Sequence, residues 1–243
     1  MTPAQALNKH RAEEITDEQL LRILVTYDSW CVPSQPEDDG HRMLVLQRDE
    51  GPVVEAFTTE EAYAEHMQQV SEQPFGWMTV SGEWLFSNLN DTLIALEINA
   101  PQGVRFTFKS KVFATLRNWS RSVLVERALV TQMDDAATFQ LLCESTFLIV
   151  STQPDVVPLQ IALAPDSNGR TLAAIFTAPD ALNLYLQAAQ KSTNASLSTH
   201  SVSGKPLFSS LASMSIDGVV FNCFGPTKPL AVSHRFTTAF LDN

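Results

Sequence analysis

Residues 80–89, VSGEWLFSNL, and residues 202–211, VSGKPLFSSL, are two versions of one pattern within the same chain. Both segments contain Val-Ser-Gly, then Leu-Phe-Ser, then Leu, with identical spacing. A pattern that returns after 122 residues in a chain of 243 residues indicates that a whole folding unit has been duplicated.

The correspondence extends outward from these segments. Phe57-Thr58 matches Phe176-Thr177 at an offset of 119 residues, and Asn99 lies near the position that corresponds to Asn222. We expect the repeated Phe residues to pack in the core and the repeated Thr residues to cap the helix that follows. In each Ser-Gly pair, we expect Ser to begin the next helix and Gly to supply an unusual backbone angle.

Hydrophobic periodicity predicts an α+β fold of two repeated mixed α/β units, each a small sheet with flanking helices. The first unit is expected to contain helices at 17–28, 60–70 and 84–89 and strands at 43–46, 53–57, 77–80, 92–98 and 104–108, with a loop at 34–40. The second is expected to contain helices at 136–144, 179–190 and 206–211 and strands at 146–151, 159–163, 172–176, 198–202 and 218–223.

These elements predict three segments of the chain. Residues 1–108 form the first unit with an N-terminal helix, 109–135 form a connecting and bracing segment, and 136–243 form the second unit. The connecting segment is apolar enough near its centre to be structured.

The order of elements resembles the SseB N-terminal domain family, here in two diverged copies. The Phe-Thr and Leu-Phe positions carry the resemblance, together with strands that end in Asn shortly before Pro. The family's Asn-Pro-Gly stretch is replaced by Asn99-Ala100-Pro101 in the first copy. The resemblance implies a bacterial, non-enzymatic protein associated loosely with secretion systems, and it supplies no catalytic residues.

The acidic composition limits the classes of molecule that the chain is expected to bind. The net charge is -11, and residues 1–120 carry 18 Asp and Glu against 9 Lys and Arg. This charge argues against nucleic acid and anionic membranes as partners and favours a basic protein partner, met by the first half. Three isolated cysteines and an N-terminus without an apolar run predict a cytoplasmic protein.

Sequence patterns for catalysis were sought without result. The nine glycines form no phosphate-binding loop, no two histidines have metal-ligand spacing, and no nucleophile elbow occurs. We therefore expect no catalytic residues, no cofactor and no metal. The alternative is an enzyme or small-ligand binder with a site between the two units, for which His234, Asp217 and Cys223 are the first candidates.

The leading hypothesis is a non-catalytic protein-interaction module, either immunity-like or associated with secretion. Its predicted binding residues are an acidic loop, the acidic pair expected across a hairpin from it, and one tryptophan that has proline opposite it in the second copy. They are Glu37, Asp38, Asp39, Asp49, Glu50 and Trp84. Self-association into a homo-oligomer remains open.

Overall fold

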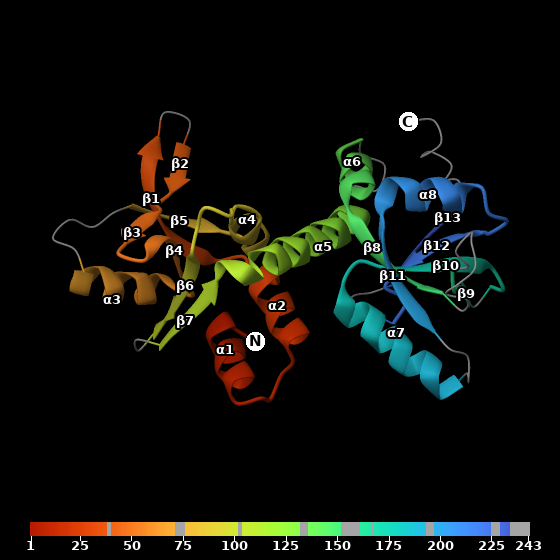
Figure 1. Cartoon of the computed structure of the whole chain (residues 1–243), viewed down its shortest axis with the longest axis horizontal. Helices are drawn as coiled ribbons and strands as arrows, with labels where there is room; N and C mark the ends of the chain where they lie inside the picture. The colour runs from red at the N-terminus through yellow and green to blue at the C-terminus, as the bar shows by residue number, and fades with distance from the viewer. Residues whose placement is uncertain are drawn as a thin grey trace. The chain divides into compact units, whose positions relative to one another are not determined.

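The computed structural model describes residues 1–37, 40–70, 76–101, 104–131, 136–151, 161–166, 168–192, 197–224 and 229–233 (Figure 1). The chain divides into two compact units, Met1–Val123 and Leu124–Asn243. The division falls inside helix α5 (Phe113–Thr131), so this one helix contributes residues to both units. Each unit is described by itself below.

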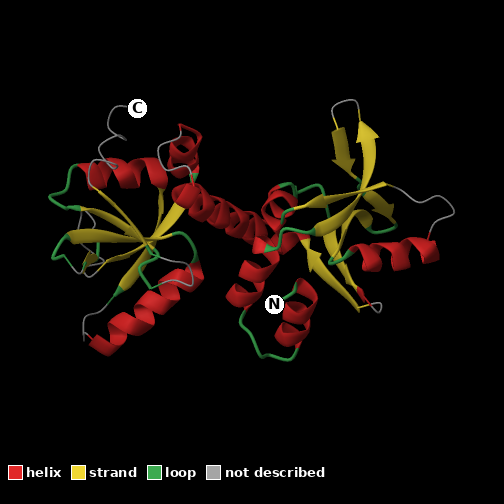
Figure 2. Ribbon diagram, turned by 180° about the vertical axis from the view of Figure 1, so that it is seen from behind, coloured by secondary structure: helices red, strands yellow, loops and turns green. Residues whose placement is uncertain are grey.

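The first unit contains a sheet with helices on both of its faces (Figure 2). Its helices are α1 (Pro3–Arg11), α2 (Asp17–Thr26), α3 (Glu60–Val70) and α4 (Gly82–Ser87), with the short 3-10 turn η2 (Ser110–Val112) before α5. Its strands are β1 (Trp30–Glu37), β2 (Gly40–Met43), β3 (Leu46–Arg48), β4 (Gly51–Phe57), β5 (Gly76–Val80), β6 (Ala95–Ala100) and β7 (Val104–Lys109).

The second unit has the same kind of layers. Its helices are α6 (Ala136–Glu144), α7 (Pro179–Ser192) and α8 (Gly204–Ala212). Its strands are β8 (Thr146–Ser151), β9 (Leu163–Pro165), β10 (Thr171–Phe176), β11 (Ser198–Ser203), β12 (Gly218–Phe221) and β13 (Leu230–Ser233).

The two sheets share one strand order. The first runs β5-β1-β4-β6-β7, and the second runs β11-β8-β10-β12-β13. In both sheets the central pair is parallel and its neighbours are antiparallel: β4 and β6 in the first, β10 and β12 in the second. The predicted α+β fold of two repeated units is therefore confirmed.

Local sequence explains where the helices begin. Thr2 and Thr16 form capping boxes with Gln5 and Gln19, which satisfies free N–H groups at the starts of α1 and α2. At α3, the Thr59 hydroxyl accepts a hydrogen bond from the Ala62 N–H at 3.2 Å. Thr59 caps this helix; Thr58 and Thr59 were both expected as candidates, and the repeated position, Thr58, does not cap it.

Residue alternation along β1 separates the two faces of the first sheet. Trp30 faces α2 and α4: its indole N–H donates to the Leu24 carbonyl, and its ring meets Phe86 edge to face, with centroids 6.0 Å apart. Cys31 points the opposite way and packs with Phe57, under α3.

The second unit repeats this arrangement with different side chains. Phe147 takes the place of Trp30 and meets Phe208 edge to face, with centroids 5.3 Å apart, in a core that α6 and α8 cover. On the other face, Phe176 packs under α7 against Tyr185. The repeated Phe57 and Phe176 are both fully buried, as predicted.

The repeated Ser-Gly pairs have a steric explanation. A Cβ on Gly82 would lie 2.4 Å from the Leu24 carbonyl oxygen, and one on Gly204 would lie 1.9 Å from that of Leu142. Neither glycine has a positive φ, so the predicted unusual backbone angle is wrong. Glycine is required because the start of one helix touches the end of another, and each glycine N–H donates at 2.7 Å to a carbonyl there, of Tyr27 and Ser145 respectively.

The repeated threonines differ between the units. Thr177 donates from its hydroxyl to the Glu126 carboxylate at 2.6 Å, and the hydroxyl accepts from the Asn222 side-chain amide at 2.8 Å. The Thr177 backbone N–H donates to the Asn222 side-chain oxygen at 3.0 Å. In the first unit, the buried Thr58 hydroxyl and the Asn99 amide nitrogen have no hydrogen-bond partner among the described residues.

Several sequence-based assignments differ from the structure. The strand predicted at 43–46 spans the break between β2 and β3, where Leu44 and Val45 belong to neither strand. Residues 34–37, expected as a loop, continue strand β1, which forms a hairpin with β2. Helix α1 and strands β1 and β13 were not predicted. The predicted strand at 159–163 lies partly outside the described residues; Ile161 forms a bridge to Ser151, and β9 begins at Leu163.

Candidate protein-binding surface on the first unit

The predicted acidic residues occupy two separate hairpins. Glu37 ends strand β1, and Asp38 and Asp39 lie outside the described residues. Asp49 and Glu50 form the exposed turn between β3 and β4. The prediction placed the two acidic groups across one hairpin, but β1 pairs with β2 and β4 pairs with β3, so they belong to different turns.

Trp84, the other predicted binding residue, lies on α4 and is 39% exposed. Its backbone N–H donates to the Ser81 hydroxyl at 3.1 Å, which caps the helix. Because α4 packs with Trp30 on the face opposite α3, Trp84 lies away from the surface described next.

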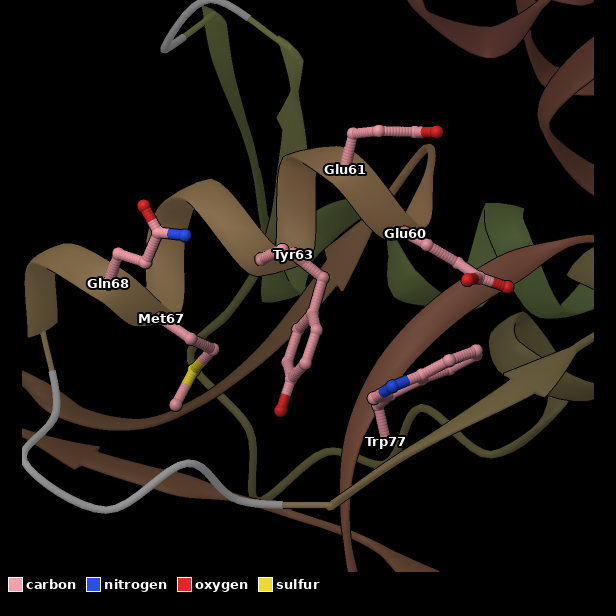
Figure 3. A pocket seen from close by; sticks show the side chains of 7 residues that line it. Glu60, Glu61, Tyr63, Met67, Gln68 and Trp77 are labelled. Carbon is pink, nitrogen blue, oxygen red and sulfur yellow. The ribbon is translucent and has the colours of Figure 1, made fainter.

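A groove between helix α3 and strand β5 combines aromatic and acidic side chains (Figure 3). Its volume is about 600 Å³. Tyr63 and Met67 project into it from α3, while Glu60 extends from the start of α3 toward the indole of Trp77. The described residues that line this groove, here called the Trp77 hollow, are Glu60, Glu61, Tyr63, Ala64, Met67, Gln68 and Trp77.

The aromatic part of the Trp77 hollow is held in place from both sides. The Tyr63 hydroxyl donates to the Gly76 carbonyl at 3.3 Å, which ties α3 to the start of β5. The Tyr63 and Trp77 ring centroids lie 6.3 Å apart at 51°, within the range of favourable aromatic pairs. Trp77 remains 39% exposed, so a large apolar ring faces solvent in a hollow that Glu60 and Glu61 also line.

A second, smaller hollow of about 310 Å³ lies beside the first. It shares Glu60 and Glu61 with the Trp77 hollow and is lined further by Tyr27, Ser29, Cys31, Thr59 and Thr79; we call it the Thr79 hollow. Burial, followed by the negative charges of Glu60 and Glu61, raises the pKa of the Cys31 thiol to about 11. The Cys31 thiol is therefore protonated at neutral pH.

Beyond α3 on the same side of the sheet lies a group of charged side chains around Glu55, here called the charged face. Glu55 is 2% exposed, and its carboxylate lies 2.6 Å from Arg48 and 3.2 Å from His66. On the neighbouring strand, Glu97 lies 3.8 Å from Arg105. Glu55 and Glu97 are in register on adjacent parallel strands, so both carboxylates project to this face.

The charged face borders an open polar hollow of about 620 Å³. Asp49 and Glu50 lie at its rim, where Glu50 is 3.8 Å from Lys109. The hollow has acidic and basic side chains in similar number, so it does not share the acidic character of the groove beside β5.

The equivalent face of the second unit is apolar. Ala174 and Val220 occupy the positions of Glu55 and Glu97 in the same parallel register. Tyr185 stands where His66 does, with its ring 5.1 Å from Phe176, while the His66 ring is 5.2 Å from Phe57. The fold therefore does not require charges at these positions.

Of the alternative enzyme candidates, the two in the described part of the chain, Asp217 and Cys223, lie at opposite ends of one strand. Asp217 precedes strand β12 and accepts a hydrogen bond from the Thr171 N–H, whereas Cys223 follows the other end of that strand. His234 lies outside the described residues. In the described part of the chain, no three His, Cys, Asp or Glu side chains are placed to hold a metal ion.

Sequence reasoning missed the groove beside β5. It placed Glu60 and Glu61 only at the start of the helix predicted at 60–70, and Trp77 only at the start of the strand predicted at 77–80. One signal could have identified the groove: Thr199 aligns with Trp77, and Pro179 aligns with Glu60, so the two copies differ at these positions.

Comparison with known proteins gave limited results. No protein-family model matches the chain, and no curated protein matches it. Tic22 from Anabaena, described as a protein-transport protein, aligns over 83% of this chain and 88% of its own at 10% identity, with a TM-score of 0.23. Tic22 from Plasmodium falciparum aligns over 91% and 96% at 7% identity, with a TM-score of 0.21. TM-scores of this size do not establish a shared fold.

Within the described residues, no helix combines the length and the apolar composition needed to cross a membrane.

Proposed function

We propose that this chain is a non-catalytic protein-interaction module of the cytoplasm, whose first unit binds a basic surface of a partner protein. The observation that carries the proposal is the Trp77 hollow, where Glu60 extends toward an exposed indole and Glu61 also lines the hollow. Exposed aromatic residues are enriched in the energetic centres of protein interfaces.

Charge supports a basic partner. The first 120 residues carry twice as many acidic as basic side chains, and this field attracts a positively charged surface before contact. An exposed carboxylate beside an aromatic ring offers such a surface both a charge partner and an apolar contact.

The family resemblance adds a biological context to the proposal. An SseB-like protein with this surface would act as an immunity-like inhibitor of a basic toxin or as an accessory factor in secretion. A gene for a toxin or for a secretion component beside the gene for this chain is the expected observation. Unrelated neighbouring genes would leave the binding proposal to stand on the groove alone.

Site-specific photo-cross-linking tests the binding proposal. A photoreactive phenylalanine at Gln68, which lines the Trp77 hollow, is expected to give one discrete adduct in the cells that make the protein. The matched control is the same substitution at Gln187, which is exposed at the aligned position of α7. We expect the Gln68 adduct to weaken with added salt, because the attraction is electrostatic.

Two outcomes would count against the proposal. One is the absence of any adduct both at Gln68 and at acidic positions of the first unit, such as Glu50. The other is the same set of adducts at Gln68 and Gln187, which would indicate random collision.

A further inference from the structure

The spacing between the Trp77 and Thr79 hollows matches the two-residue repeat of an extended strand. Trp77 and Thr79 are two residues apart on β5 and pair with Pro33 and Cys31 of β1, so both face the α3 side of the sheet. Two residues of a strand span about 6.8 Å, and an extended peptide has the same repeat. A segment lying along β5 would therefore present every second side chain to one of these hollows.

The chemistry of the Trp77 hollow matches a guanidinium group. An indole face attracts a cation, a carboxylate accepts paired N–H donors, and the apolar walls formed by Tyr63 and Met67 suit the methylene stem of a long side chain. Arginine presents a planar fork that stacks on the ring and bonds the carboxylate together, whereas lysine presents only a point charge.

The charge of the two hollows favours a basic occupant throughout. Glu60 and Glu61 line both, and the described lining residues of either hollow include no Lys, Arg or His. Their negative charge reaches the floor of the Thr79 hollow, since it contributes to the raised pKa of Cys31. A second cation entering this hollow would meet the same carboxylates.

The second unit lacks this combination of side chains. There, Pro179 and Thr199 align with Glu60 and Trp77, and Leu182 aligns with Tyr63. The shared fold thus accounts for the helix and the strand, but it does not account for an indole, a phenol and a carboxylate that converge on one hollow.

We propose that the groove binds an extended segment of a basic protein with arginine in the Trp77 hollow and a second basic residue, two positions along, in the Thr79 hollow. This inference rests on the proposed function and specifies the partner's recognition pattern as basic residues at alternate positions.

Fluorescent peptides with alternate and adjacent basic residues test the pattern. The sequence Gly-Ser-Arg-Ser-Arg-Ser-Gly is compared with Gly-Ser-Arg-Arg-Ser-Ser-Gly and with Gly-Ser-Lys-Ser-Lys-Ser-Gly, by fluorescence anisotropy with the full chain at low ionic strength. We expect the alternating arginine peptide to bind about fivefold more tightly than either of the others. Equal affinity for the first two peptides would overturn the alternate pattern.

Variants of the chain locate the binding. Trp77→Ala is expected to weaken the alternating arginine peptide by about tenfold and Glu60→Gln by about fivefold. Trp77→Phe, which keeps a ring, is expected to retain part of the affinity and shows that loss in Trp77→Ala is not a folding defect. Circular dichroism of each variant provides a second check on folding.

Trp84→Ala separates this inference from the proposed function. Trp84 is as exposed as Trp77 but lies on α4, outside both hollows. Loss of binding in Trp84→Ala but not in Trp77→Ala would overturn the proposal that the groove beside β5 binds the peptide. A protein-binding function would remain, with its site on α4. Absence of peptide binding, together with a Gln68 cross-link to a partner, would overturn arginine recognition alone.

Discussion

Two faces built to the same plan differ in what they bury. Under α7, the second unit packs Ala174 and Val220 into a continuous apolar core, whereas the first unit places Glu55 and Glu97 at those positions beside α3. A buried carboxylate is unfavourable unless it is paired, and Glu55 is paired with Arg48 and His66. The same fold thus carries paired charged side chains on this face of the sheet in one unit and apolar side chains in the other. Each unit can therefore serve as the control for substitutions in the other.

The largest expected effect on stability comes from placing a carboxylate like that of Glu55 in the second unit, without the Arg and His that pair with it in the first. Ala174→Glu would bury a carboxylate in the apolar core of the second unit, and we expect it to destabilise that unit by about 4 kcal/mol. Urea unfolding followed by far-UV circular dichroism measures the change.

Tryptophan fluorescence provides an internal control for this experiment. All four tryptophans lie in the first unit: Trp30, Trp77, Trp84 and Trp119. We expect their transition to be unchanged in Ala174→Glu. A loss of less than about 1 kcal/mol in the second unit would mean that its core tolerates charge, and the contrast between the faces would lose its meaning.

The next effect tests a feature that the units share. Gly204→Ala and Gly82→Ala are each expected to cost about 3 kcal/mol, because the added methyl group would overlap a backbone carbonyl that cannot move freely. Circular dichroism reports both losses, and tryptophan fluorescence reports only that of Gly82→Ala. Gly169→Ala is the control, since a Cβ there meets nothing within 4 Å, although its φ of +75° makes alanine mildly unfavourable.

A smaller effect should distinguish the repeated threonines. Thr177→Val removes a hydroxyl that bonds Glu126 and Asn222, and we expect a loss of about 2 kcal/mol. Thr58→Val removes a buried hydroxyl without a described partner, and we expect a change close to zero. Equal losses in the two variants would show that Thr58 has a bonding partner that its surroundings do not reveal.

The double variant Glu55→Ala/Glu97→Val gives the first unit the side chains of the second. Replacing buried ion pairs by apolar groups is often neutral or stabilising, so we expect unfolding by tryptophan fluorescence to shift by no more than about 1 kcal/mol. A strong loss would indicate that the charged face is needed for the fold itself.

The smallest difference is expected between two thiols. Burial raises the pKa of both Cys31 and Cys223 to about 11, so at pH 8 only about 0.1% of each is thiolate. Alkylation by iodoacetamide, followed by mass spectrometry, should be about a hundredfold slower than for a free cysteine peptide and should rise about tenfold per pH unit up to pH 10. Rapid labelling of either residue at pH 8 would contradict the assigned environment.

Local signals predicted the repeated elements well, because they depend on nearby residues. Helix α6 (Ala136–Glu144) and strand β8 (Thr146–Ser151) begin and end where periodicity placed them. Strand β1 was not predicted, because the proline and acidic residues of 34–40 indicate a loop; in the structure, pairing with β2 and β5 carries the strand through Pro33 and Pro36. The role of Gly82 was also predicted wrongly, because it depends on a residue distant in the sequence: a Cβ at position 82 would overlap the Leu24 carbonyl oxygen.

The binding surface was less predictable than the fold. Residues that the two copies share, such as Phe57 and Phe176, are buried in the cores, so the repeated pattern predicted the architecture. Residues that differ between the copies, such as Trp77 and Thr199, report what each unit does beyond folding. The positions at which the two copies differ therefore indicate the groove from the sequence alone.

The contact at each repeated glycine also sets an order of events during synthesis. Tyr27 and Gly82, and likewise Ser145 and Gly204, are joined by a backbone hydrogen bond although more than fifty residues separate them in the chain. The glycine end of each contact leaves the ribosome long after its partner. Until then, the apolar side of α2 or α6 has no helix to close against, and each unit can complete its fold only when its second half has emerged.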